Sequence, residues 1–166
     1  MPRKTSTNIH TSRAVIGVTW IVVADAAQAQ IYSRETRKAP LELLHSFTEE
    51  KARATEHDLH ADSPGRTFDS LGAGRHAKQP EHTARQNLRI AFARQIADFL
   101  EAGRTANRFE HLAIVAAPAL LGELRAHLSQ PALQLVIVEI PKHMTAETPA
   151  AIAEAVLESE GTPKPL

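Results

Sequence analysis

Basic residues gather in the middle of the chain, and they are the side chains that most suggest chemistry. Three glycines, two arginines and a histidine fall between Pro64 and His76, and further basic residues follow them. Glycine adopts positive φ at low steric cost and arginine offers a planar fork of donors, so such a segment can wrap a phosphate or approach another backbone closely. The residues predicted to bind an anion, RNA or a protein partner are Arg66, Gly72, Gly74, Arg75, His76, Lys78, His82, Arg85 and Arg89.

The same residues also have a purely structural interpretation. Arg66 or Arg75 can pair with a nearby acid, and the candidates are Asp62, Asp69 and Glu81. Such a pair would do no more than order a surface loop. No Walker-type lysine follows the glycines, so the spacing does not indicate a nucleotide-binding P-loop. The sequence leaves both interpretations open, the binding surface and the self-ordered loop.

A second group of residues has the composition of a metal site. His57, Asp58 and His60 lie close together, with Asp62 just beyond them. Imidazole nitrogens and carboxylate oxygens are ligands for zinc or manganese, and on a helix His57 and His60 would share a face. This arrangement would serve a metal-dependent hydrolase. The alternative, which we favour, is a solvated helix of mixed charge, and we expect the protein to need no cofactor.

Two carboxylates raise the possibility of nuclease chemistry. Asp25 directly follows the first predicted strand, where a nuclease of the ribonuclease H type carries its leading metal ligand. Two-metal phosphoryl chemistry needs several converging carboxylates, and only Glu139 offers itself as a second one. We therefore interpret Asp25 as a turn residue.

Length and composition limit the range of functions. A chain of 166 residues is long enough for one domain with its own core, and the absence of cysteine excludes disulfides, zinc–thiolate sites and cysteine nucleophiles. The net charge is zero, but residues 65–90 hold five basic against two acidic side chains, and residues 139–160 hold five glutamates against one lysine. Local charge guides the choice of partner more than the sum does. One end of the molecule is therefore predicted to meet an anionic partner.

The first half of the domain reads as three strands followed by a long connection. Residues 18–24 are β-branched and almost continuously apolar, as in a strand covered on both faces. A turn at 25–28 and an alternating segment at 29–34 predict a hairpin, and a third strand is predicted at 41–47. Residues 48–79 carry no sustained period beyond a short charged helix within 49–59, and connections of this length tend to be functional or disordered.

The second half alternates helices with strands. Pro80 is predicted to open a helix that runs to Ala102, before Gly103; on it Arg85 and Arg89 align with Phe92 and Ile96, so its first turns should project beyond the core. The remaining predictions are a strand at 111–117, a helix at 118–129 ended by Pro131, a strand at 133–140 and a helix capped by Thr145 that ends near Ser159. The order β-β-β-loop-α-β-α-β-α predicts an α/β sandwich on a mixed sheet.

The domain boundaries and the location of the protein follow from the ends of the chain. Residues 1–17 read as a disordered basic leader, residues 18–160 as a single domain with the long loop 48–79, and residues 161–166 as a tail. The leader lacks the apolar region of a secretory signal, and no segment approaches the roughly 18 apolar residues of a membrane span. We therefore expect a cytoplasmic protein.

Several spaced motifs resemble the bacterial host attachment protein family. The likeness extends over about residues 18–158, and the segments that support it are Trp20–Tyr32, Asp58-Leu59, Asp62–Ser70, Gly72–His76 and Leu112–Pro118. The family is named for a role in attaching plant-associated bacteria to host cells. The resemblance implies a part in attachment and leaves the molecular activity undefined.

A more distant resemblance is to the middle domain of archaeal and eukaryotic peptide release factors, which has a ribonuclease H-like fold. The order of elements is similar, and Gly72-Ala73-Gly74-Arg75 stands where that domain carries the Gly-Gly-Gln motif that reaches the ribosome. The resemblance implies that fold and contact with RNA. The missing glutamine argues against hydrolysis of peptidyl-tRNA.

Three functions follow in order of preference. The first is a non-enzymatic binding protein of the host attachment family that uses residues 64–89 as its contact surface. The second is an RNA-binding or ribosome-associated factor that uses the same surface, with no DNA specificity expected. The third is a metal-dependent hydrolase built on His57, Asp58 and His60. The partner would be a ribosome, RNA or an acidic protein surface, and the oligomeric state is not predicted.

Overall fold

The computed structural model describes residues 16–54 and 78–161, and the side chains of residues 17–54 and 82–161. The leader before residue 16, the centre of the predicted loop and the tail after residue 161 lie outside these ranges. Residues 50–54 are helical, so the short charged helix predicted within 49–59 is present at least at its start.

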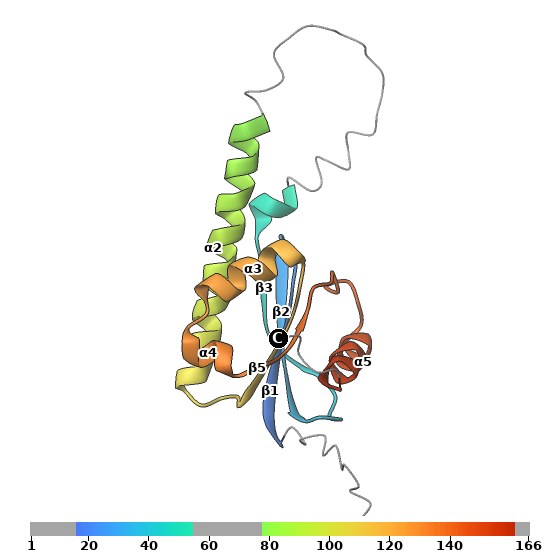
Figure 1. The fold of residues 1–166 in the computed structure, drawn as a ribbon. Helices are drawn as coiled ribbons and strands as arrows, with labels where there is room; N and C mark the ends of the chain where they lie inside the picture. The colour runs from blue at the N-terminus through green and yellow to red at the C-terminus, as the bar shows by residue number, and fades with distance from the viewer. Residues whose placement is uncertain (1–15, 55–77, 162–166) are drawn as a thin grey trace, which may run out of the picture.

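The core of the molecule is one five-stranded mixed sheet (Figure 1). Its strands are β1 (Ile16–Ala24), β2 (Gln28–Thr36), β3 (Glu42–Thr48), β4 (His111–Ala116) and β5 (Val136–Ile140), in the spatial order β3-β2-β1-β4-β5. The pairs β1–β2 and β2–β3 are antiparallel, whereas β1–β4 and β4–β5 are parallel. The predicted mixed sheet is confirmed.

Helices cover both faces of the sheet (Figure 1). The first face carries α2 (Lys78–Thr105), α3 (Pro118–His127) and α4 (Gln130–Gln134), and the second face carries α5 (Pro149–Glu160). Successive residues of a strand point to opposite faces, so Trp20 and Val22 of β1 pack in the α2 layer and Ile21 and Val23 in the α5 layer. This double burial explains why the β1 sequence is continuously apolar.

The end of α2 differs from the prediction. Gly103 was expected to follow the helix, but it lies inside α2, which runs on to Thr105. The chain then leaves the helix through Asn107, which has a φ of 53°. Gly103 serves packing instead, because a Cβ added there would lie 2.4 Å from the indole of Trp20.

Three further boundaries are corrected near the C-terminus. Pro131 was expected to end a helix, but α3 already ends at His127, and Pro131 lies in the first turn of α4, where Ser129 caps the backbone N–H of Ala132. The strand predicted from residue 133 begins at Val136 because α4 occupies the preceding residues. The cap of α5 is Thr148, not Thr145; its hydroxyl accepts from the N–H of Ala151 at 3.2 Å.

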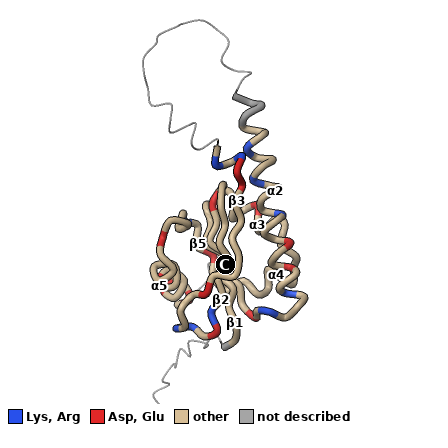
Figure 2. The backbone as a smooth tube through the Cα atoms, turned by 180° about the vertical axis from the view of Figure 1, so that it is seen from behind, with Lys and Arg blue, Asp and Glu red and all other residues tan. Residues whose placement is uncertain are grey.

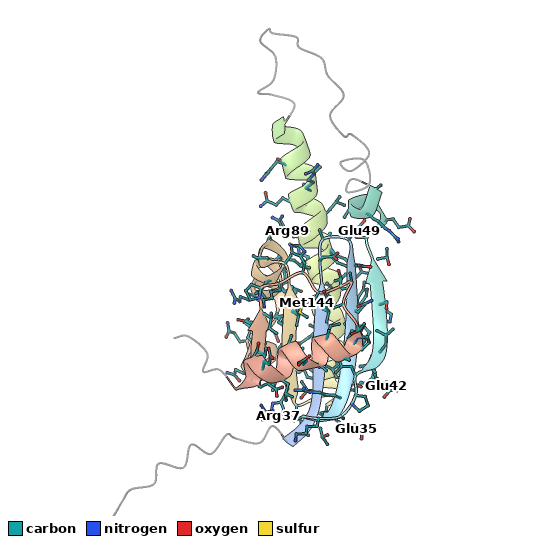
Figure 3. The ribbon with its side chains drawn as sticks, turned by 90° about the vertical axis from the view of Figure 1, so that its right-hand side faces the viewer. Glu35, Arg37, Glu42, Glu49, Arg89 and Met144 are labelled. Atoms are coloured by element: carbon teal, nitrogen blue, oxygen red, sulfur yellow. The ribbon has the colours of Figure 1, made fainter. Side chains whose placement is uncertain are left out.

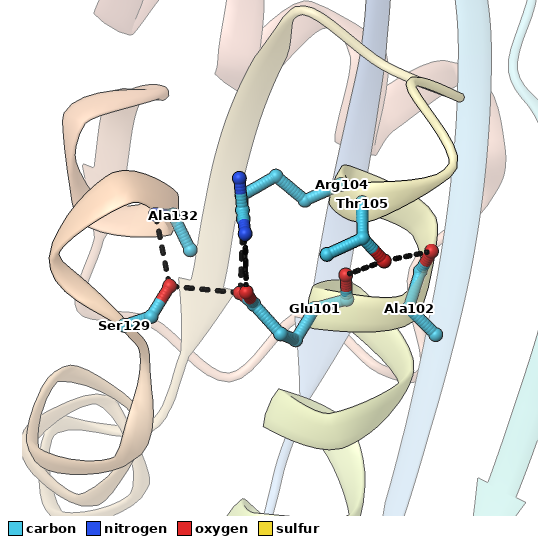
Figure 4. A network of polar contacts seen from close by, with 6 residues as sticks. All are labelled: Glu101, Ala102, Arg104, Thr105, Ser129 and Ala132. Atoms are coloured by element: carbon cyan, nitrogen blue, oxygen red, sulfur yellow. Dashed lines mark hydrogen bonds and ion pairs between the residues drawn. The ribbon is translucent and has the colours of Figure 1, made fainter.

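A polar network joins α2 to the start of α4 (Figure 4). The Glu101 carboxylate accepts from Arg104 at 2.5 and 3.0 Å and from the Ser129 hydroxyl at 2.8 Å. Ser129 is also the cap of α4, so one carboxylate orders the ends of two helices. The hydrogen bonds from Arg104 and then Ser129 lower the pKa of Glu101 below its ordinary value of 4.5.

Replacement of Glu101 by glutamine should make stability less sensitive to acid. Because the pKa of Glu101 is depressed by folding, its contribution is present above pH 4.5 and is lost as the pH falls through the lowered pKa. Urea unfolding of the two proteins between about pH 5.5 and about pH 3 measures this difference. The exposed Glu154 of α5 provides the control as Glu154→Gln. Parallel pH profiles for wild type and Glu101→Gln would contradict the prediction.

Candidate functional site

The carboxyl ends of the three parallel strands meet at one edge of the sheet, which we call the carboxyl edge. β1 ends there at Ala24, β4 at Ala116 and β5 at Ile140. The start of α2 and the helical residues 50–54 lie at the same end of the molecule (Figure 1). In open α/β sheets, ligands bind outside the carboxyl ends of the strands. We therefore expect a functional site at this edge.

Asp25 links two loops at the carboxyl edge. Its Oδ1 accepts from the backbone N–H groups of Ala27 and Gln28, each at 2.9 Å, and its Oδ2 accepts from the hydroxyl of Thr145. The turn between β1 and β2 is thereby fastened to the loop after β5. The interpretation of Asp25 as a turn residue is confirmed.

The second carboxylate of the nuclease interpretation is also engaged. Glu139 accepts from Arg125 of α3 at 3.0 Å through Oε1 and at 2.6 Å through Oε2. Within residues 16–54 and 78–161, no group of three or more His, Asp or Glu side chains is placed to hold a metal ion. The described residues therefore give two-metal chemistry no support.

The first turns of α2 extend beyond the sheet, as predicted (Figure 1). Every side chain from His82 to Asn87 is exposed, whereas Phe92 is 1% exposed and Ile96 is fully buried. Arg85 lies within this exposed part. His82 and Arg85 are therefore presented to solvent at the carboxyl edge.

Arg89 has a different environment from Arg85. It lies one turn closer to the core, where its Nη2 is 3.7 Å from Oε1 of Glu123 on α3, and its side chain is 28% exposed (Figure 3). Its Nε is buried and has no hydrogen-bond partner among the described residues. The structural interpretation therefore fits Arg89 better than a role as a freely presented ligand-binding group.

One stretch of α2 and the whole of α5 differ in the sign of their charges (Figure 2). From His82 to Ala97, α2 carries three arginines and no acid, whereas α5 carries three glutamates and no base. The three arginines are Arg85, Arg89 and Arg94. Arg94 is exposed too, but it lies on the side of α2 opposite the apolar stripe and was not among the predicted binding residues.

The remaining predicted site residues lie outside the described residues. They are Arg66, Gly72, Gly74, Arg75 and His76 of the binding set, and His57, Asp58 and His60 of the metal set. Lys78 is the first residue of α2, but its side chain is not among those described. For all of these residues the sequence-based interpretations stay predictions.

A family model described as "Protein required for attachment to host cells" matches residues 20–156. The match runs from Trp20 in β1 to Val156 in α5, so it takes in part or all of every strand and helix described above. The chain belongs to this host attachment family. The resemblance seen in the sequence is thereby confirmed.

A search of the curated proteins found no match to this host attachment family member. Among the described residues, no helix is both long and apolar enough to cross a membrane.

Proposed function

We propose that this host attachment family member is a non-enzymatic binding protein that contacts its partner through the carboxyl edge. The observation that supports the proposal most is the exposed segment of α2 from His82 to Asn87, which carries Arg85 and no acid and extends beyond the sheet. Residues 54 and 78, between which the glycine- and arginine-rich segment runs, both belong to this end of the molecule. Arg85 is the described member of the proposed contact surface, and the sequence-based prediction adds Arg66 and Arg75 to it.

The chemistry of this surface favours an anionic partner. Arginine forms bidentate, charge-assisted hydrogen bonds with carboxylates and phosphates. In the same part of the molecule, the carboxylates of Asp25 and Glu139 are held by hydrogen bonds to other residues. A surface of presented cations, on which Asp25 and Glu139 are already engaged, suits binding better than acid–base catalysis.

An attachment assay tests this proposal. A strain lacking the gene is complemented with the wild type, with Arg85→Ala or with Arg94→Ala, and bacteria bound to host cells are counted. We expect Arg85→Ala to lower attachment toward the level of the deletion strain and Arg94→Ala to retain it. Both arginines are exposed on α2, so the pair is matched in charge and helix. Full attachment with Arg85→Ala at equal protein levels would contradict the proposed surface.

RNA is the second candidate partner. Arg85 is exposed at the end of α2 that extends beyond the sheet, which suits contact with a phosphate backbone. The distant sequence resemblance to release-factor middle domains, which implies a ribonuclease H-like fold, points to the same candidate. Contacts of this kind position a protein on nucleic acid without reading its sequence, so no DNA specificity is expected.

Ribosome sedimentation and RNA titration test the second candidate. We expect the protein to sediment with ribosomes from its own cells at low salt and to be released at high salt. In titrations with a single-stranded RNA, Arg85→Ala should weaken binding on all sequences alike and reduce the slope of log affinity against log salt by about 1. Binding that does not change with salt, or no binding by the wild type, would remove RNA as the partner.

A further inference from the structure

Arg89 of α2 contacts Glu123 of α3 without a hydrogen bond, although both side chains are largely shielded from water. We propose that Arg85 and Arg89 together bind a phosphate group and that Glu123 competes with this ligand for Arg89. The inference rests on the function proposed above, because it names the chemistry of the anion that the Arg85 surface takes and a residue that sets its affinity.

The contact is longer than the other arginine–glutamate contacts of the described residues. Arg37, Arg104 and Arg125 donate hydrogen bonds to glutamates at 2.9, 2.5 and 2.6 Å. By contrast, Arg89 Nη2 and Glu123 Oε1 are 3.7 Å apart, which is beyond hydrogen-bonding distance. The Nε of Arg89 is buried and has no acceptor among the described residues either. Arg89 therefore keeps hydrogen-bond donors that the described part of the chain does not use.

An unused donor in this place costs free energy. The side chains of Arg89 and Glu123 are 28% and 21% exposed, so most of each is out of contact with water. A guanidinium has five N–H donors, and a buried donor without an acceptor loses the hydrogen bond that water would give it. An acceptor from outside the chain that reaches Arg89 recovers this loss. The pair is thus better suited to exchange its partner than a hydrogen-bonded pair such as Arg125 and Glu139.

Arg85 and Arg89 point from α2 in nearly the same direction. At about 100° per residue, each lies within about 20° of Ile96, which is fully buried against the sheet. The first turns of α2 extend beyond the sheet, so the same stripe carries the exposed Arg85 there (Figure 1). Arg94 lies on the opposite side of the helix. Arg85 and Arg89 can therefore reach one ligand at the carboxyl edge, and Arg94 cannot.

The spacing of the two arginines favours a phosphate group over a carboxylate. Like charges four residues apart on a helix repel one another, and from His82 to Ala97 α2 carries no acid of its own to offset the repulsion. An anion between the two guanidinium groups removes it. The planar fork of one arginine already satisfies a planar carboxylate, whereas a tetrahedral phosphate group has further oxygens for a second fork. This chemistry is shared by free phosphate and by the backbone of a nucleic acid.

Glu123 sets how tightly the ligand is held. Its carboxylate already offsets part of the charge of Arg89, and a phosphate group at Arg89 lies beside this like charge. Because the ion pair is largely shielded from water, salt screens the repulsion less than it would at an exposed position. Replacement of Glu123 by glutamine should therefore tighten binding, whereas breaking a purely structural ion pair would bring no gain in affinity.

Inorganic phosphate and acetate, compared at equal ionic strength, test the site in the full chain. The Nε–H of Arg89 gives an NMR signal that disappears in Arg89→Lys and is thereby assigned. We expect phosphate to shift this signal until it saturates and acetate to leave it in place. Arg85→Ala should weaken the response to phosphate about tenfold, and Arg94→Ala should not. A signal that stays in place with phosphate, or moves equally with acetate, would overturn the proposal.

Glu123→Gln is the decisive variant, because a misfolded protein does not gain affinity. The dissociation constant for inorganic phosphate should fall about fivefold when the competing charge is removed. Glu50→Gln is the control, since Glu50 is exposed, belongs to the same end of the molecule and carries the same charge. Its loss should change the dissociation constant less than about twofold, because salt screens exposed charges. An equal gain in both variants, or no gain with Glu123→Gln, would rule out competition for Arg89.

Titration with a single-stranded RNA separates the two sources of phosphate. If the RNA backbone occupies the site, Glu123→Gln tightens RNA binding as it tightens the binding of inorganic phosphate; if free phosphate alone does, RNA binding does not respond. The same variants keep this inference apart from the proposed function. An effect of Arg85→Ala on attachment, with no response of either probe to Glu123→Gln, would overturn the two-arginine site and leave the contact surface standing. No effect of Arg85→Ala in any assay would contradict both.

Discussion

Replacement of Glu160 by alanine should lower the free energy of unfolding by about 3–5 kcal/mol, because it leaves a buried cation without its counterion. The side chains of Arg34 and Glu160 are 1% and 3% exposed, and Arg34 Nη2 contacts Glu160 Oε1. Arg37 donates to the other carboxylate oxygen at 2.9 Å. Burial, followed by the charge of Arg37, already lowers the pKa of Arg34, so the loss of Glu160 removes the counterion of a cation that its surroundings disfavour. Urea unfolding measures the effect.

The control for Glu160 is another glutamate paired with an arginine. Glu139 pairs with Arg125, whose side chain is 52% exposed, so Glu139→Ala leaves a cation that water can solvate. Exposed pairs contribute about 1 kcal/mol or less, and Glu139→Ala should therefore have the smaller effect. Equal losses in the two variants would mean that the burial of Arg34 does not govern stability.

Gly103→Ala should lower the free energy of unfolding by about 2 kcal/mol, although alanine is the better helix former. The new Cβ would lie 2.4 and 2.5 Å from two carbon atoms of the Trp20 indole. Trp20 has little room to move, because its ring centroid lies 5.7 Å from that of Phe99 and 4.7 Å from that of Phe109. The overlap therefore outweighs the gain in helix propensity. Thermal and urea unfolding measure the result.

Gly122 supplies the matched control for Gly103. It lies in α3, is exposed, and a Cβ there meets no atom within 4 Å. Gly122→Ala should therefore raise stability by about 0.5–1 kcal/mol through helix propensity alone. A stabilised Gly103→Ala protein would show that the layer between α2 and the sheet can relax around Trp20.

The type and order of the described elements could be predicted because each depends on a local pattern. The continuous apolar run at 18–24 identified β1, and the stripe through Phe92, Ile96 and Leu100 identified the buried part of α2. The projection of His82 and Arg85 also followed from this stripe, because the angle between residues on a helix is constant. The same periodicity did not separate Arg89 from Arg85, since the partner of Arg89 is Glu123 on another helix.

The boundaries that were wrong involve residues with more than one possible role. Gly103 and Pro131 were interpreted as helix terminators, but one makes room for Trp20 and the other starts α4. Thr145 and Thr148 are equally good caps in the sequence, and the contact of Thr145 with Asp25 decides between them. A local pattern shows what a residue can do, and its neighbours in space select one of those roles.

Local chemistry accounts for the α/β class, the alternation of strands and helices, and the separation of charge between residues 65–90 and 139–160. Tertiary structure alone brings together Asp25 with Thr145 and Arg34 with Glu160, contacts that span 120 and 126 residues. It also places β3 at the edge of the sheet and leaves one side of its backbone unpaired. Periodicity depends on neighbours three or four residues away, whereas these contacts depend on how the layers pack, and packing is settled only when the whole chain has folded.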